Sequence, residues 1–220
     1  MGIDFDFGAV LGQWPLLLRG VLWTLGLTAI ATVIGMVVGV ACAWSRASGP
    51  TWLRWVVGSY VELIRNTPFI VQLFFIFFGL PAAGFKLSPE VASVIAMVMN
   101  LGAYATEIIR AGIEAVPKGH IEAGLSLAMT KWEVLRRIVL NQAFRKIYPA
   151  LSSQIIIVML GSAVVSQISA EDLTYAANFV ASRNFRNFEV YLLAALAYLL
   201  LAMLTRSLLR ALGRVIFKAR

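Results

Sequence analysis

The ionisable residues of this 220-residue sequence gather at a few places where acid–base chemistry is conceivable. Glu107, Arg110 and Glu114 are spaced so that one helix face carries alternating charges. Glu62 and Arg65 stand at i, i+3 and can pair with each other. Two roles are open for the first group. We expect a ladder that fixes a helix end against a neighbour, and the alternative is proton transfer through Glu107.

The sequence gives little support for a metal site, a reactive thiol or a nucleotide-binding site. The only histidine is His120, and no pair of histidines or carboxylates stands at metal-ligand spacing. The only cysteine, Cys42, lies in an apolar stretch, which excludes an internal disulfide and argues against a cysteine-based metal site. No GxxxxGK[ST] phosphate loop is present, so the chain should not hydrolyse ATP. We expect no metal, no cofactor and no catalytic residue, which makes an intramembrane enzyme the weakest alternative.

The elements that carry these residues must lie in a membrane. Sixty per cent of the residues are hydrophobic and only 14% are charged, with a mean hydropathy of +0.82, whereas soluble domains are about 25% charged. A spanning helix needs about 20 apolar residues, and residues 21–44 and 147–170 carry no charge at all. We predict an all-α integral membrane protein, one domain over residues 1–220 without a clear internal repeat. Its five spans are predicted at about 18–45, 55–81, 88–113, 147–170 and 188–211.

The basic residues give these spans an orientation. With five spans, one set of loops carries most of the lysines and arginines: Arg46, Arg54, Arg110, Lys118, Lys131, Arg136, Arg137, Arg145, Lys146, Arg206, Arg210, Arg214, Lys218 and Arg220. The opposite loops carry Lys86, Arg183 and Arg186, while Arg19 and Arg65 lie at span boundaries. Because positive loops stay in the cytoplasm, we predict an external N-terminus and a cytoplasmic C-terminus. The net charge of +8 is then a topology signal and not a nucleic-acid footprint.

A proline interrupts the second predicted span. In "YVELIRNTPFIVQLFF" we expect one helix to end near Arg65 and another to begin at Pro68, with Asn66 or Thr67 as its N-cap. A structural kink with an interfacial arginine is the expected role of this stretch. A direct gating role is the alternative.

Residues 120–137, "HIEAGLSLAMTKWEVLRR", are too polar to span and too patterned for a loop. Their apolar side chains recur at helical spacing: Ile121, Leu125, Met129, Trp132 and Leu135. Such a helix could lie on the membrane surface or dock in a groove of a partner protein. The first half carries no lysine or arginine and is rich in small residues that allow close approach: Ala123, Gly124, Ser126 and Ala128. The partner interpretation is therefore slightly favoured.

This stretch resembles a known motif. "EAGLSLAMTKWEVLRRIVLNQA" is similar to the EAA signature of permease subunits of ATP-binding-cassette (ABC) importers, with Glu122, Ala123 and 138–140 matching. Gly124 replaces the third Ala, Ala128 replaces Gly, and Asn141 replaces Pro. "YVELIRNTPFIVQLFFIFFGLP" and "NLGAYATEIIRAGIEAVPKGHIEAG" resemble the polar amino acid branch of that family, and the likeness covers about 18–212.

The resemblance implies a type I ABC importer transmembrane domain in a bacterial inner membrane. It implies a cytoplasmic coupling helix at about 119–131 that sits in a cleft of the ATPase subunit, with Glu122 bonded at the helix start. The coupling residues would be Glu122, Ala123, Gly124, Leu125, Ala128 and Met129. The implied partners are two ATPase subunits that bind ATP and Mg²⁺, a periplasmic amino-acid-binding protein, and a second permease. The departures from the motif favour a homologous but different second permease chain, with a homodimer as the alternative.

The resemblance also places the substrate pathway in the third to fifth spans. Candidate polar residues at membrane depth are Asn100, Tyr104, Gln154, Ser162 and Ser166. The two serines are expected on one helix face. A bond back to its own helix is the favoured role of each, and contact with the cargo is the alternative. Glu62, Arg65, Pro68, Glu107 and Arg110 would be structural or gating residues. An importer of another small polar solute stays open, and so does a proton-coupled carrier, although such carriers usually show internal repeats.

Overall fold

The computed structural model describes residues 5–218, which form helices and no strands. Four helical runs in that range are long and apolar enough to cross a membrane: α2 (Trp14–Ser48), α6 (Pro89–Glu114), the run Lys131–Ile168 and α11 (Asn187–Lys218). A fifth is obtained if α3 (Thr51–Arg65) and the helical segment Phe69–Ala82, bent by 114°, form one broken span. The predicted all-α membrane class is confirmed, whereas the predicted span limits stay predictions.

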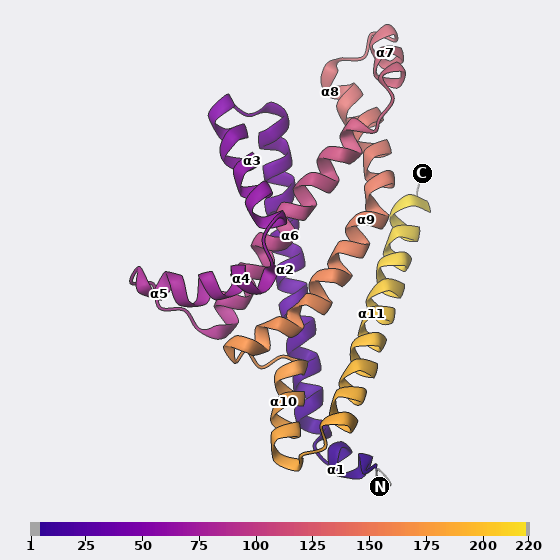
Figure 1. Ribbon diagram of the computed structural model, residues 1–220. Coiled ribbons are helices and arrows are strands. Elements are labelled where there is room, and N and C mark those ends of the chain that lie inside the picture. The colour runs from indigo at the N-terminus through magenta and orange to yellow at the C-terminus, as the bar shows by residue number, and fades with distance from the viewer. Residues whose placement is uncertain (1–4, 219–220) are drawn as a thin grey trace.

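Helices α2 and α6 cross near the centre of the molecule, and α11 runs along one edge (Figure 1). Helix α6 continues to one tip of the molecule, where α7 (Lys118–Ser126) and α8 (Lys131–Glu133) lie, and the chain returns through α9 (Leu140–Gly161). A π-helical stretch, Val134–Val139, joins α8 to α9. The short helices α1 (Phe7–Leu11) and α10 (Leu173–Asn184) pack at the opposite end, beside the start of α11.

Small residues bring α2 and α6 into close contact. A Cβ atom added at Gly39 would lie 2.6 Å from the Cβ of Ala105, and one added at Gly102 would lie 2.8 Å from Cγ1 of Val38. Lipid provides no hydrophobic drive between helices, so close van der Waals packing between small residues has to hold them together. The α2–α6 contact is therefore the rigid centre around which the other helices are arranged.

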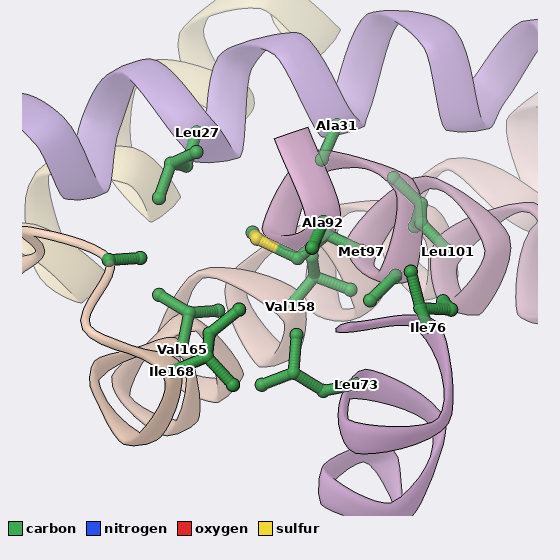
Figure 2. Close-up of a cluster of buried hydrophobic side chains, with 12 residues drawn as sticks. Leu27, Ala31, Leu73, Ile76, Ala92, Met97, Leu101, Val158, Val165 and Ile168 are labelled. Carbon is green, nitrogen blue, oxygen red and sulfur yellow. The ribbon is translucent and has the colours of Figure 1, made fainter. Parts of the chain in front are cut away.

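The largest buried cluster lies where α2, α4 (Phe69–Phe74), α6 and the end of α9 meet (Figure 2). Leu27 of α2, Leu73 of α4 and Met97 and Leu101 of α6 are all at most 2% exposed. Helix α11 differs, because only 11% of its most apolar window is buried. Its apolar side chains therefore face the surroundings of the chain, as expected for a helix that borders lipid or another membrane subunit.

The predicted break at Pro68 is confirmed, but its expected cap is wrong. Helix α3 ends at Arg65 and α4 begins at Phe69. Asn66 Nδ2 donates to the Glu62 carbonyl at 2.8 Å, and Thr67 Oγ1 donates to the Leu63 carbonyl at 2.8 Å. Both side chains fold back onto the end of α3, where the Glu62 carbonyl also accepts the Asn66 backbone N–H at 3.1 Å, so neither caps α4.

Gln72 holds this bend from the other side. Its Nε2 lies 2.7 Å from the Ile64 carbonyl and 2.9 Å from the Thr67 carbonyl. Its Oε1 accepts a hydrogen bond from Asn100 Nδ2 of α6 at 3.2 Å. A buried amide thus joins α3, α4 and α6 at one point. The α4 segment continues through the π-helical turn Phe75–Gly79 into α5 (Leu80–Ala82) and projects sideways from the molecule (Figure 1).

At the other end of the molecule, Asp172 anchors α10. Its carboxylate accepts the N-capping hydrogen bond from the Tyr175 backbone at 2.8 Å and a second bond from the Tyr198 hydroxyl of α11 at 2.9 Å. The residue is fully buried. Burial disfavours the charged form and raises the pKa of the Asp172 carboxyl above its ordinary value, because its hydrogen bonds compensate only in part.

Candidate functional site

The segment expected as one amphipathic helix over 120–137 is a hairpin. Helix α7 ends at Ser126, and the chain turns before α8 begins at Lys131. The expected helix over 120–137 is therefore broken at 127–130, and the expected coupling helix over 119–131 ends five residues early, at Ser126. We call residues 118–139 the α7 hairpin.

A Schellman motif makes this turn. The Met129 N–H donates to the Gly124 carbonyl at 3.2 Å, and the Ala128 N–H donates to the Leu125 carbonyl at 3.0 Å. Between them Ala128 adopts φ +58°, the left-handed conformation that this motif requires and that glycine usually provides. This is the position at which the EAA signature has glycine. The substitution keeps the backbone geometry of the motif and adds the strain of a Cβ.

A capping box restarts the helix after the turn. The Glu133 N–H donates to Thr130 Oγ1 at 3.2 Å, and the Thr130 N–H donates to Glu133 Oε2 at 3.0 Å. Two backbone donors that would lack helical partners are satisfied in this way. The stop and the restart therefore have separate, identifiable causes within eight residues.

The predicted apolar stripe is divided by this turn. Ile121, Met129 and Leu135 pack inward on a small core around Val134 and Val139, between the two arms of the hairpin. Leu125 and Trp132 remain 45% and 59% exposed, and Leu127, which lies outside the predicted stripe, is 79% exposed. One part of the stripe thus forms the core of the hairpin, and the rest of the stripe is exposed on its surface.

Gly124 is packed inside the hairpin, and its expected role in seating the partner stays a prediction. It is buried, and an added Cβ would lie 2.7 Å from Cδ1 of Ile138 and 3.0 Å from Cγ2 of Val134. Its close approach within this chain is therefore to the second arm of its own hairpin. Glu122, Ala123, Leu125 and Ala128 are exposed, and Met129 is half-buried. The Glu122 carboxylate forms no ion pair with any residue of the described range, so its expected bond at the helix start is missing from this chain.

The predicted charge ladder is present and larger than expected. Arg110 Nη2 lies 2.8 Å from Glu107 Oε2, and Arg110 Nη1 lies 2.6 Å from Glu114 Oε1. Arg46 of α2 also pairs with Glu107, and Arg65 Nη1 approaches the same carboxylate at 3.7 Å. Three guanidinium groups from three helices therefore surround one carboxylate whose side chain is only 15% exposed. We call Arg46, Arg65, Glu107 and Arg110 the Glu107 cluster.

The expected Glu62–Arg65 pair is wrong. Arg65 turns to Glu107 and stacks over the Tyr104 ring, with its Cζ 5.7 Å from the ring centroid. Glu62 instead accepts a hydrogen bond from Asn66 Nδ2 at 3.0 Å. The partly buried Glu107 carboxylate is less screened by solvent than the exposed Glu62, and the Tyr104 ring adds a cation–π contact, so together they outweigh the neighbour on the same helix.

The predicted pathway residues do not form one surface. Asn100 bonds to Gln72, Tyr104 lies under Arg65, and Gln154 is buried on α9. Ser162 and Ser166 are buried, and their hydroxyls donate to the carbonyls of Met159 and Ala163 within their own helix. They lie in a 3₁₀ segment, Ser162–Ile168, where three residues complete a turn, so positions i and i+4 point about 120° apart. The expectation of a shared serine face is therefore wrong.

Comparison with known proteins now adds to this geometry. The family described as "Binding-protein-dependent transport system inner membrane component" matches residues 14–218. The chain belongs to this family. It is a permease subunit and not an enzyme, and the family assigns it to importers of the inner membrane that work with an ATPase and a binding protein.

Individual relatives cover nearly the whole permease. It is 41% identical to the L-cystine transport system permease protein TcyB of Bacillus subtilis, over 87% of this chain and 82% of that protein. It is 33% identical to the glutamine transport system permease protein GlnP of Escherichia coli, over 96% and 98%. A chain of a solved amino acid ABC transporter with histidines superposes with a TM-score of 0.90 at 37% identity, covering 96% of this permease and 99% of that chain. The predicted type I importer fold is thereby confirmed.

Proposed function

We propose that this permease conducts an amino acid that a periplasmic binding protein delivers, and that the α7 hairpin couples this transport to an ATPase. The cargo class is supported by the relatives named for cystine and glutamine and by the solved amino acid transporter. Another small polar solute is the alternative cargo. The coupling role is carried by one observation, the exposed apolar face of a hairpin that is held rigid at the tip of the molecule.

The geometry of the hairpin suits a lever. Its core, Schellman turn and capping box fix α7 against the start of α9, so a force on the exposed face moves both arms together. Leu125 and Leu127 provide apolar contact area and Glu122 an unpaired carboxylate, the combination that a cleft with a cationic rim would accept. ATP and Mg²⁺ bind to the partner ATPase in this proposal, and the assembly holds two ATPase copies.

The Glu107 cluster would pass the motion on. Helix α6 carries Glu107 and Arg110, ends at Glu114 and leads into α7 at Lys118, so the cluster lies on the helix that the hairpin would move. Because one carboxylate binds arginines of α2, α3 and α6, these three helices should tilt as a unit when α7 is pushed. Arg65 stands at the bend before Pro68, so the same cluster would also set the angle between α3 and α4.

Two further parts of the proposal concern the assembly. A second permease completes the pathway, and the degenerate EAA motif favours a homologous but different chain over a second copy of this one. The orientation follows from the basic loops, with the N-terminus periplasmic and the α7 hairpin cytoplasmic.

Cysteine labelling tests the orientation. In a Cys42→Ser background, Lys86→Cys should react with a membrane-impermeant maleimide in intact spheroplasts, and Lys118→Cys should react only after lysis. Both native side chains are exposed, so a difference in labelling reports the side of the membrane. Reaction of Lys118→Cys in intact spheroplasts would reverse the proposed orientation.

Uptake measurements test the function. The cognate binding protein should bind one or a few amino acids, and uptake of the same amino acid should stop on ATP depletion and survive an uncoupler. Uptake that an uncoupler abolishes at full ATP would favour a proton-coupled carrier. A binding protein that ignores every amino acid and binds another small polar solute would keep the importer and change the cargo.

A further inference from the structure

A cavity of about 450 Å³ opens between α9 and α11 and is unusually basic. Four arginines line it, Arg145 from α9 and three from α11: Arg206, Arg210 and Arg214. The three stand at i, i+4 and i+8 and therefore form one stripe along the helix. The two helices run side by side here, with α11 at the edge of the molecule (Figure 1).

The positive charge of this cavity is not balanced within the chain. None of the four guanidinium groups forms an ion pair with a residue in the described range 5–218, although six other arginines do. Arg145 only stacks over the Phe217 ring, with its Cζ 5.6 Å from the centroid. Ser152 and Ser153 also line the cavity, and their hydroxyls have no hydrogen-bond partner among the described residues. Unpaired guanidinium and hydroxyl donors together fit a ligand with several anionic oxygens.

The remaining lining of the cavity is mostly apolar and lies between two closely packed helices. The Tyr148 hydroxyl donates to the Leu209 carbonyl at 2.5 Å, and an added Cβ at Gly213 would lie 2.6 Å from Cε1 of Tyr148. Helices α9 and α11 therefore pack closely against each other beside the cavity, through Tyr148. On the side of α11 that carries the arginines, Leu199 and Met203 stand seven and three residues before Arg206 and are 54% and 57% exposed. A ligand here must combine an anionic group with a large apolar part.

We propose that this cavity binds the phosphate of an anionic phospholipid, with the acyl chains lying along the exposed apolar surface of α11. Basic pockets between helices at the cytoplasmic end of membrane proteins recognise such headgroups. Arginine suits the role because its planar fork binds two phosphate oxygens at once. The apolar part of the lining, with Pro149, Ile156 and Phe217, and the exposed side chains before Arg206 favour a lipid over free phosphate, which would gain nothing from them. Only the choice of leaflet, the cytoplasmic one, rests on the orientation proposed above.

Native mass spectrometry of the assembled importer tests this site. The importer is released from nanodiscs that contain phosphatidylcholine and phosphatidylglycerol, and the retained lipids are counted. The test variant is Arg206→Gln with Arg210→Gln. The matched control is Lys86→Gln with Arg183→Gln, which removes two exposed positive charges that lie outside the cavity and outside the α7 hairpin. Arg210→Lys keeps the charge and removes the fork.

The test variant should lower the preference for phosphatidylglycerol over phosphatidylcholine by roughly 5- to 30-fold, since each guanidinium near a membrane surface contributes about a five-fold preference. The control variant should leave it unchanged, and Arg210→Lys should lie between them. Equal preference in the test and control variants would overturn the proposal. So would loss of the lipid on addition of inorganic phosphate alone, which would make this a free-phosphate site. Dissociation of the two permease chains in the test variant, with lipid retention intact, would instead make the cavity a subunit interface.

Discussion

Ala128 is the residue at which the local strain of the α7 hairpin can be measured. A left-handed conformation costs an L-residue about 1–2 kcal/mol, and glycine avoids that cost. Glycine loses about 0.4–1 kcal/mol more backbone entropy on folding than alanine. Because Ala128 has φ +58°, Ala128→Gly should stabilise the hairpin by a net amount of about 0.5–1 kcal/mol.

The same chemical change nearby should have the opposite sign. Ala123 is exposed within α7 and lies in a regular helix, so Ala123→Gly should destabilise the hairpin by about 1 kcal/mol. The two variants differ only in the backbone conformation of the substituted residue. The pair therefore separates the left-handed turn from any general effect of glycine.

Hydrogen–deuterium exchange of the assembled importer, without nucleotide, measures both effects. The Met129 N–H reports the turn, because it donates to the Gly124 carbonyl. A change of about 0.5–1 kcal/mol in local opening corresponds to roughly 2- to 5-fold in exchange rate. Exchange should therefore slow in Ala128→Gly and quicken in Ala123→Gly. Faster exchange in both variants would mean that Ala128 is not left-handed and that the segment is one continuous helix.

Three further variants address the other parts of the structure. Gly124→Val should overpack the hairpin against Ile138 and destabilise it by about 1–3 kcal/mol. The amount of ATPase that co-purifies with the permease should fall. An unchanged amount would show that ATPase binding does not depend on the packing of the hairpin. Glu107→Gln should lower the unfolding free energy by about 1.5–3 kcal/mol, because three guanidinium groups lose their carboxylate. Glu114→Gln, at an exposed pair, should lower it by less than about 1 kcal/mol. Equal effects of the two variants in a denaturant titration would contradict the role of the Glu107 cluster. Burial raises the pKa of Asp172, so its contribution to stability is full below the unfolded value of about 3.9 and is lost as pH rises through the folded pKa. Thermal unfolding midpoints should fall across that window, and Asp172→Asn should flatten the slope; an unaltered slope would assign it to other groups.

The sequence predicted what depends on local chemistry. The charge-free runs predicted the membrane class, Pro68 predicted the break after Arg65, and the spacing of Glu107, Arg110 and Glu114 predicted their ladder. Each of these features is decided within a few residues of the chain.

The remaining features depended on partners far away in the chain. Helical spacing paired Arg65 with Glu62, but the fold brings Glu107 of another helix to it. The role of Gln72 could not be predicted from the sequence. Its side chain donates hydrogen bonds to the Ile64 and Thr67 carbonyls, which only the bend between α3 and α4 brings within reach. The sequence shows that Ala128 replaces the glycine of the motif. It does not show the strain that follows, because only the backbone conformation reveals that the position is left-handed. A capping box starting at Thr130 could have been found, because Thr130 and Glu133 stand at the required spacing.

Photo-cross-linking from the α7 hairpin tests the central proposal most directly. A photoreactive phenylalanine analogue replaces Leu125, whose side chain is 45% exposed, or Phe85, which is 65% exposed and lies outside the hairpin. In the assembled importer the probe at position 125 should form a covalent adduct with the ATPase subunit, and the probe at position 85 should form none. An adduct at position 125 with lipid alone, in an importer that still retains its ATPase, would show that the hairpin lies on the membrane surface and does not couple the two subunits.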